Sequence, residues 1–576
     1  MKKLLTVCQL VILLTGMLGA EVSIWCIGDS RKVTFYDDKP QVKNYIWDAS
    51  SKTVNLKSAR NEYTAFQAVL KNDVAITDIK AEISDFGSGI KAELFKEFYV
   101  DCLGDKYPDA LIPFVDPYSG KHETIVSSFD LERKANQPIW VDIFVPEDAK
   151  PGEYKALLKF TAKDIKEEIN VILKVKDIVI PKKKQVIGYH NASYALLGRK
   201  NQKGKNDIVS RENIRLNYGQ EIDDESWEVL KNYFITFHEH NSGLGLWRLQ
   251  PRGAETGEPV WTSYDKYMKD VITGKLFRDK EPLPCFMLPF REKDHIEFGN
   301  EKLEKYAKAV ARHWKDNKWD LTNSFAYFID EPRNNTDDKN FEIIKEMSGI
   351  IRGAGLKFAV ATHMPEPYMT EDDYQVFADS VDWAWFSGST YYPPEMKKLQ
   401  AKGTKCSVYQ SGSRFPKETI DAEGVNFRVW GWLAFKYGVD GIFHYDACQW
   451  GFNKNPYLKP NDYDESQLGN GIMVYPGNML STIGFPKIKG PVTSFRLKAM
   501  RRGILDCEYF YMAKQKGIDV DTLISSVVKD GLANSFGGWK NTGKGDWSNN
   551  WEDYDKVRDL LGDKIIEAGS KIKGEK

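Results

Sequence analysis

The sequence predicts a multi-domain chain in which an N-terminal antiparallel β-sandwich precedes a (β/α)8 TIM-type barrel and a C-terminal helical extension. Residues 21–180 consist of short alternating or apolar runs separated by turn residues, which is typical of an antiparallel sandwich. Residues 185–515 instead alternate apolar strands with long helix-compatible stretches, as parallel strand-helix units do. The length of 576 residues also exceeds what one hydrophobic core usually serves.

Residues 1–20 have the order of a secretory signal peptide. Two lysines after Met1 precede a mostly apolar stretch over 4–14, and small residues follow up to Ala20, where we expect cleavage. Neither Cys8, inside this segment, nor Cys26 has the small-residue context of a lipid-attachment site. No later stretch approaches about 18 uncharged apolar residues. We therefore expect a secreted or periplasmic protein without stable membrane insertion.

Turn residues divide the sandwich region and mark its end. The apolar runs 139–145 and 154–160 flank a segment rich in Pro and Gly, which predicts a β-hairpin. The basic stretch Pro181 to Lys184 follows the last strand-like run and is interpreted as a solvated linker between the domains.

Eight apolar runs after the linker are the expected strands of the barrel. They are residues 186–190, 243–249, 284–288, 325–329, 357–361, 381–386, 405–409 and 441–445. Because the chemistry of such barrels gathers at the carboxyl ends of the strands, functional side chains are expected directly after each run.

Composition excludes several classes of function. Lys and Arg number 81 against 82 Asp and Glu, so no basic surface for nucleic acid is expected. The seven cysteines include no Cys-x-x-Cys pair, which argues against a zinc cage or a redox pair, although disulfides are compatible with an oxidising compartment. His238 and His240 have a spacing compatible with a metal, but only Glu239 accompanies them. We expect neither a metal nor a cofactor.

The fourth predicted strand ends in Asp330-Glu331-Pro332. The same dipeptide elsewhere, at Asp224 and Asp464, stands in polar surroundings, so only this pair closes an apolar strand. Two close carboxylates repel each other, so the pKa of one rises and that group can act as a general acid, while the other stays charged. Adjacent strand residues point to opposite faces, and a shared pocket therefore requires the turn that Pro332 marks.

Two mechanisms are compatible with these carboxylates. Asp446, directly after the eighth strand, can complete an ordinary pair of separated carboxyls with Glu331, as glycosidases use. If the substrate carries a 2-acetamido group, its own carbonyl oxygen can attack the anomeric carbon, and an adjacent Asp-Glu pair supplies the acid and the group that orients the amide.

Further candidates for substrate binding stand near the strand ends. They are Trp385, Tyr409, Tyr445, Trp450, Asp446, Trp432, His240, Arg291 and Tyr391. We expect Trp385, Tyr409, Tyr445 and Trp450 to face the carboxylates, because aromatic faces suit the C–H surface of a pyranose ring. Tyr409 or Tyr445 is the candidate for a hydroxyl that binds the acetamido oxygen.

The sequence resembles glycoside hydrolase family 123 over nearly the whole mature chain. The matching segments are residues 137–140, 146–154, 330–332, 432–441, 471–477 and 494–509. The resemblance implies β-N-acetylgalactosaminidase activity, with retention of configuration through an oxazoline-like intermediate. Glu331 would be acid and then base, and Asp330 would hold the acetamido nitrogen. It also implies a helix over 492–514 that closes the barrel, with Arg496 and Asp506 in structural ion pairs.

The leading interpretation is an exo-acting β-N-acetylhexosaminidase that acts on a glycan or oligosaccharide, N-acetylgalactosamine being favoured over N-acetylglucosamine. One alternative is a barrel glycosidase for a sugar without the acetamido group, with Glu331 as acid and Asp446 as nucleophile or base. A second is a non-catalytic glycan-binding protein of the cell envelope, against which the intact Asp330-Glu331 pair argues. Residues 516–576 are expected to form a helical extension that packs on the barrel, with Trp539, Trp547 and Trp551 as docking residues.

Overall fold

A computed structural model describes most of the chain after the predicted signal peptide. The described residues are 22–163, 165–192, 196, 212, 214, 222–246, 249–291, 293–332, 341–362, 371–388, 393–410, 416–450, 455–460, 467–529 and 546–574. Among the predicted features, the signal peptide, Trp539 and Tyr391 lie outside these residues. In the part described, no helix is long and apolar enough to cross a membrane.

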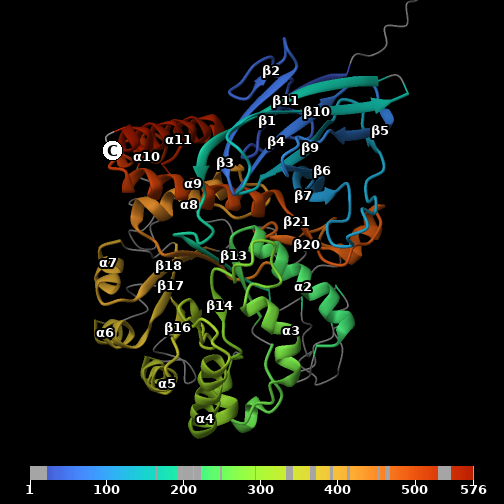
Figure 1. Ribbon diagram of the computed structural model, residues 1–576. Helices are drawn as coiled ribbons and strands as arrows, with labels where there is room; N and C mark the ends of the chain where they lie inside the picture. The colour runs from blue at the N-terminus through green and yellow to red at the C-terminus, as the bar shows by residue number, and fades with distance from the viewer. Residues whose placement is uncertain are drawn as a thin grey trace, which may run out of the picture.

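The N-terminal domain consists of two sheets that pack against each other (Figure 1). The five-stranded sheet has the order β1-β4-β9-β6-β7, and the six-stranded sheet has the order β2-β3-β11-β10-β5-β8. The strands are β1 (Ser23–Gly28), β2 (Trp47–Asp48), β3 (Thr53–Arg60), β4 (Glu62–Lys71), β5 (Ile76–Ile83), β6 (Lys91–Cys102), β7 (Asp105–Pro113), β8 (Phe129–Leu131), β9 (Asn136–Val145), β10 (Gly152–Ala162) and β11 (Ile165–Val179). All of their ladders are antiparallel except β3 with β11, so the predicted sheet-rich domain is confirmed.

The predicted hairpin between residues 139–145 and 154–160 is wrong. These runs are β9 and β10, and they lie in different sheets. Strand β9 is hydrogen-bonded to β4 on one side and β6 on the other, so it has no edge left for β10. Strand β10 pairs with β11 and β5 instead. The Pro-rich segment therefore carries the chain from one sheet to the other.

The second domain contains eight parallel strands at the predicted positions. They are β12 (Ile187–Asn191), β13 (Ser242–Gly245), β14 (Phe286–Met287), β15 (Ser324–Phe325), β16 (Ala359–Thr362), β17 (Trp383–Ser387), β18 (Lys405–Gln410) and β19 (Gly441–His444). Six form one parallel sheet in the order β13-β12-β19-β18-β17-β16, and β14 pairs with β15. Parallel bridges from Ala326 to Phe358 and from Asp330 to Ala361 join the β15 segment to β16. Strand β13 contacts β14.

Helices separate these strands and lie around them (Figure 1). They are α2 (Asp224–Glu239), η1 (Ala254–Thr256), α3 (Thr262–Ile272), α4 (Asp294–Asp316), α5 (Phe341–Gly353), α6 (Glu371–Ser380), α7 (Pro393–Ala401) and α8 (Val425–Tyr437). After β19 come β20 (Val474–Pro476), η2 (Gly477–Ile483), β21 (Pro491–Thr493), α9 (Phe495–Gln515), α10 (Asp521–Val527) and α11 (Trp551–Gly574). The side chain of Asp223 accepts a hydrogen bond from the Ser226 amide at 2.7 Å and so begins α2 as a cap.

The parallel strands enclose a buried aromatic cluster that is separate from the main core. This inner cluster consists of Ile187, Tyr189, Cys285, Met287, Phe325, Tyr327, Ala359, Ala361, Trp383, Trp385, Tyr409 and Phe443. Strand neighbours such as Ala326 and Phe328 belong to the main core, as the two-residue period of a strand requires. Gly245 makes room for the Tyr189 hydroxyl, because a Cβ atom at that position would lie 1.8 Å from it.

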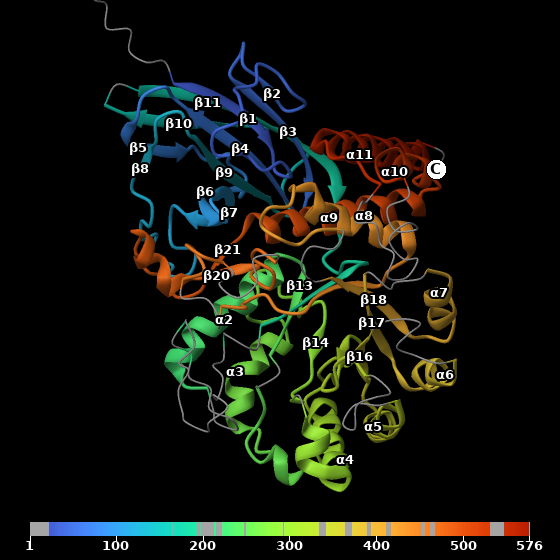
Figure 2. The ribbon, with the colours of Figure 1, turned by 180° about the vertical axis from the view of Figure 1, so that it is seen from behind.

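Helices α8 and α9 lie between the two domains (Figures 1 and 2). The two helices approach closely at Gly431 and Gly503, where a Cβ atom on Gly431 would lie 1.9 Å from the Gly503 carbonyl oxygen. The indole of Trp551, in the first turn of α11, covers Gly28 of the N-terminal domain. Helix α11 contacts both α9 and β11, so the C-terminal extension packs on both domains.

Buried ion pairs join α9 to the N-terminal domain. Arg496 contacts Asp109 with two nitrogens at 2.9 Å each, and Lys498 and Arg501 both contact Asp142. Asp506 accepts hydrogen bonds from other helices, including Arg428 of α8. Arg496 and Asp506 thus occupy the structural ion pairs that the resemblance implied. The six cysteines after the predicted signal peptide are free thiols, and all are buried.

Candidate active site

The Asp330-Glu331 pair stands at the carboxyl end of the β15 segment, where strand alternation breaks. Phe325 and Tyr327 belong to the inner cluster, but Phe328 and Ile329 both join the main core. Glu331 then adopts a φ of 45°, in the left-handed region that few residues with a side chain adopt. This irregular backbone brings two adjacent carboxylates to the same side of the sheet, as the two hydrogen bonds below demonstrate.

Each carboxylate accepts a hydrogen bond from a different buried tyrosine. The Tyr327 hydroxyl donates to Asp330 Oδ1 at 2.6 Å, and the Tyr409 hydroxyl donates to Glu331 Oε1 at 2.8 Å. Both phenol rings belong to the inner cluster, whereas both carboxylates are partly exposed. The Glu331 amide also donates to the Ala361 carbonyl at 3.0 Å, which ties the turn to β16.

The electrostatics of the site keep Tyr327 a hydrogen-bond donor. Burial raises the pKa of its phenol well above the ordinary value, and the negative charge of Asp330 raises it further. The protonated phenol can therefore donate its hydrogen bond to Asp330. The site combines two adjacent carboxyls, Asp330 and Glu331, each held by its own tyrosine donor on a different strand.

The inner cluster accounts for Trp385, which was predicted to line a sugar pocket. Its ring is 1% exposed and stacks against Tyr189 at 5.6 Å and Phe443 at 5.0 Å. That prediction is wrong, because the ring fills the space between the strands. Tyr409 lies at the carboxylates as predicted, but its hydroxyl contacts Glu331. Tyr445 is partly exposed and packs against the inner cluster.

Three further predicted binding residues are buried and contact groups other than the carboxylates. Trp450 is fully buried, and its indole nitrogen donates to the Val474 carbonyl at 2.9 Å. Trp432 is buried on α8 and donates to Asp506 at 2.9 Å. His240 follows α2 at the amino end of β13, opposite the carboxyl ends. These predictions are wrong because a sequence position near a strand does not specify which side of the helix or which end of the strand faces the site.

The remaining candidates differ in their position. Arg291 follows β14 and forms ion pairs with Asp294 and Glu297 of the first turn of α4. Asp446 is fully buried, and its Oδ1 accepts a hydrogen bond from the Cys448 amide at 2.8 Å. Tyr391 lies outside the described residues. In the described parts of the chain, no group of three or more His, Cys, Asp or Glu side chains is arranged to hold a metal ion.

Tyr327 is a site residue that the sequence reasoning missed. The sequence contains a signal for it, because Tyr327 is a polar aromatic residue three positions before Asp330. It shares the inward-facing side of this strand with Phe325. A regular strand would have turned Ile329, and not Asp330, toward the inner cluster. Only the backbone irregularity after Phe328 brings the carboxylate back to the tyrosine.

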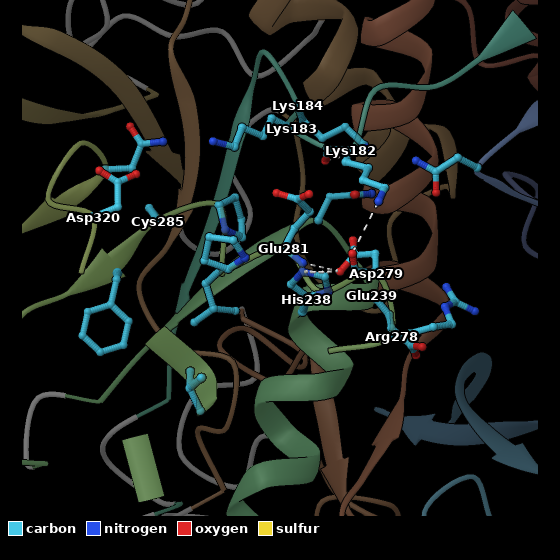
Figure 3. Close-up of a pocket in the computed structure, with 18 of the residues that line it drawn as sticks. Lys182, Lys183, Lys184, His238, Glu239, Arg278, Asp279, Glu281, Cys285 and Asp320 are labelled. Carbon is cyan, nitrogen blue, oxygen red and sulfur yellow. Dashed lines mark hydrogen bonds and ion pairs between the residues drawn. The ribbon is translucent and has the colours of Figure 1, made fainter. Parts of the chain in front are cut away.

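A separate pocket lies at the opposite, amino ends of the strands, in the junction between the domains (Figure 3). Its charged side chains largely contact one another or neighbouring protein groups. His238 lies 3.5 Å from Asp279, and the Lys182 ammonium lies 3.5 Å from the Asp279 carbonyl. The Arg278 guanidinium stacks on Phe144 at 3.6 Å. This pocket is therefore a polar crevice of the domain junction, remote from the carboxylate pair.

Comparisons with known proteins agree with this architecture. The model of the glycoside hydrolase 123 catalytic domain matches residues 293–513, and that of the glycoside hydrolase 123 N-terminal domain matches residues 38–162. No curated protein matches the chain. A solved family 123 glycoside hydrolase from Clostridium perfringens, studied for glycolipid glycan hydrolysis, is 12% identical with a TM-score of 0.58, covering 96% of this chain and all of its own.

Two further solved structures that match the chain share too little of the arrangement to support an argument. A β-glucuronidase from Parabacteroides merdae has a TM-score of 0.26 at 11% identity, over 78% of this chain and 50% of its own. A termite-gut xylanase of family 10 with an Ig-like domain has a TM-score of 0.25 at 9% identity, and the match covers 79% of this chain and 99% of the xylanase chain. The two family models together cover most of both domains and include the Asp330-Glu331 pair. The chain therefore belongs to glycoside hydrolase family 123 and is a glycoside hydrolase.

Proposed function

We propose that this enzyme is a retaining, exo-acting β-N-acetylhexosaminidase that uses the 2-acetamido group of its substrate as the nucleophile. The observation that carries this proposal is the adjacent pair Asp330 and Glu331, turned to one side of the sheet by the left-handed backbone of Glu331. Ordinary glycosidases hold their two carboxyls on separate supports, about 5 Å apart or more, across the scissile bond. An adjacent pair suits one acid and one group that orients an amide.

In the first step, the acetamido carbonyl oxygen attacks the anomeric carbon and the glycosidic C–O bond breaks. Glu331 gives its proton to the departing oxygen, and Asp330 accepts a hydrogen bond from the acetamido N–H and stabilises the positive charge of the oxazolinium ion. The Tyr409 hydroxyl holds Oε1 of Glu331, so the acidic proton belongs on Oε2. A stationary, correctly placed acid contributes about 10² to 10⁴-fold to such a step.

In the second step, Glu331 takes a proton from water as that water attacks the anomeric carbon. The bond between this carbon and the acetamido oxygen breaks, which restores the acetamido group and the protonated Glu331. Two inversions at the same carbon leave the β configuration in the product. Tyr445, partly exposed beside the inner cluster, is our candidate for the hydroxyl that directs the acetamido oxygen, since Tyr409 contacts Glu331.

The alternative pairing of Glu331 with Asp446 receives less support. Phe443 belongs to the inner cluster and Tyr445 packs against it, so alternation places Asp446 on the opposite side of the chain. Its carboxylate is fully buried and accepts the Cys448 amide in a local turn. A nucleophile for a sugar must instead reach the anomeric carbon from a partly open cleft.

We further propose that the eight parallel strands close as a (β/α)8 barrel, supported by the bridges between the β15 segment and β16 and by the contact of β13 with β14. N-acetylgalactosamine is the preferred sugar, by analogy with the family. The Clostridium relative supports a glycolipid or related glycan as substrate. The signal-like segment before Glu21 supports export from the cytoplasm.

A matched screen of aryl β-glycosides tests the proposed function. We expect release of the aryl group from 2-acetamido-2-deoxy-β-galactoside, a slower release from the gluco epimer, and none from the β-galactoside that lacks the acetamido group. A thiazoline analogue of the oxazoline should inhibit. Rapid hydrolysis of the simple β-galactoside without inhibition by the thiazoline would contradict the substrate-assisted mechanism.

A further inference from the structure

The Tyr327 hydroxyl lies behind the carboxylate that the proposed mechanism assigns to the acetamido group. It donates to Asp330 Oδ1 at 2.6 Å, a short distance typical of a hydrogen bond to a charged acceptor. We propose that Tyr327 is a positioning residue, whose phenol fixes the Asp330 carboxylate in the orientation that receives the substrate N–H. This inference rests on the proposed function and adds a specific group to it.

Tyr327 is well suited to this role because its own ring is held in place. The ring packs edge-to-face against Trp385, with centroids 4.7 Å apart at an angle of 84°. Phe443 adds a second edge contact at 6.3 Å. Only 1% of the residue is exposed, so the ring cannot turn without disturbing the inner cluster. A fixed ring gives its hydroxyl one direction, and that direction leads to Asp330.

Asp330, by contrast, is less enclosed than the Tyr327 ring. It is partly exposed, and it stands between the irregular Phe328-Ile329 step and the left-handed Glu331. The Tyr327 hydroxyl is one contact that sets the orientation of this carboxylate. Because effective positioning is lost with displacements of about 1 Å, the hydrogen bond from Tyr327 should affect turnover more than substrate affinity.

The variant Tyr327→Phe removes this hydroxyl, and Tyr189→Phe is its matched control. Tyr189 is in the same cluster, stacks on the same Trp385 and is similarly buried, but its hydroxyl contacts the Met287 sulfur at 3.3 Å and neither carboxylate. Both variants lose one buried hydroxyl and keep the ring. We expect kcat on the aryl 2-acetamido glycoside to fall about 10 to 100-fold in Tyr327→Phe, the range for a hydrogen bond to a charged group. KM should change less than about threefold, and Tyr189→Phe should stay within about twofold of the wild type in both constants.

A crystal structure of Tyr327→Phe provides a readout that does not depend on turnover. We expect Asp330 in a changed or divided rotamer while Glu331 and Tyr409 keep their contact. Asp330 in its wild-type rotamer would overturn the inference, as would wild-type kcat or an equal loss in Tyr189→Phe. If the wild type hydrolyses no 2-acetamido glycoside, the proposed function fails, and the Asp330 rotamer still decides whether Tyr327 positions it.

Discussion

Substitution of Asp142 tests whether the N-terminal domain and α9 form one structural unit. Asp142 of β9 contacts Lys498 at 2.5 Å and Arg501 at 2.6 Å, and at most 4% of each side chain is exposed. Burial disfavours the charge of Asp142, but Arg501 and Lys498 more than offset it and hold the pKa of the carboxyl well below its ordinary value. The carboxylate is therefore charged in the folded protein and joins two elements that lie more than 350 residues apart.

The change Asp142→Asn keeps the shape of the side chain and removes its charge. Two buried cations then lose the carboxylate that contacts both of them, and breaking a buried pair in this way costs about 3 to 5 kcal/mol. Lys498 already has a lowered pKa because it is buried, so it can release its proton and limit the loss. We therefore expect the free energy of unfolding to decrease by about 3 kcal/mol, the lower end of that range.

Urea unfolding followed by tryptophan fluorescence measures this loss, with Glu258→Gln as the control. Glu258 and Lys305 also lie 2.5 Å apart, but their side chains are 72% and 55% exposed, so we expect little change on breaking this pair. The stabilisation by Asp142 should be present at neutral pH and should decrease progressively as the pH falls below about 4, toward the depressed pKa of the folded protein, because protonation of the carboxylate removes its contribution. Equal effects of the two substitutions, or no effect of Asp142→Asn, would refute this reasoning.

Further predictions concern the carboxylates and the helix contact. Glu331→Gln should lower kcat by about 10² to 10⁴-fold with poor leaving groups and much less with activated aryl groups, which need little protonation, and equal losses across a leaving-group series would contradict its role as the acid. Asp330→Asn should lower kcat for both kinds of leaving group, as single-turnover rates would reveal, because it removes the charge that stabilises the oxazolinium ion; recovery with activated leaving groups would argue against that role. Gly431→Ala should destabilise the protein by about 1 to 3 kcal/mol, because its Cβ would meet the Gly503 carbonyl oxygen at 1.9 Å. The control Gly349→Ala, in open space on α5, should be neutral or stabilising. Thermal unfolding that ranks the two variants otherwise would contradict the close packing of α8 on α9.

The strand positions of the second domain were predictable because buried parallel strands leave a strong local signal. Each is a short apolar run between helix-length polar stretches, and all eight predicted runs overlap or adjoin an observed strand. The predicted β9–β10 hairpin failed because local turn signals reveal a change of direction but not which strand becomes the partner. Pairing depends on which edges are already occupied, and the edges of β9 are taken by β4 and β6.

The carboxylates of the candidate site were predictable, because charged residues at the end of an apolar strand are unusual. The aromatic residues around them were not, because packing determines whether an aromatic ring lies in the core or in a pocket. Asp330 and Glu331 were identified because two carboxylates close an apolar run. Trp385 and Trp450 also follow or end such runs, but aromatic rings serve equally well as core, and both are buried. The inward turn of both carboxylates depends on the irregular Phe328-Ile329 step and on the positive φ of Glu331, and no residue type in the sequence indicates either feature.

The measurement that most directly tests the central claim is hydrolysis of an aryl 2-acylamido-β-galactoside series with zero, one, two or three fluorines on the acyl group. Fluorine withdraws electrons from the carbonyl oxygen, which makes it a weaker nucleophile without changing the leaving group. If the acetamido oxygen attacks the anomeric carbon while Asp330 and Glu331 assist, log kcat should fall steeply with each fluorine. A rate that is independent of fluorination would contradict the account, because the nucleophile would then have to come from the protein or from water.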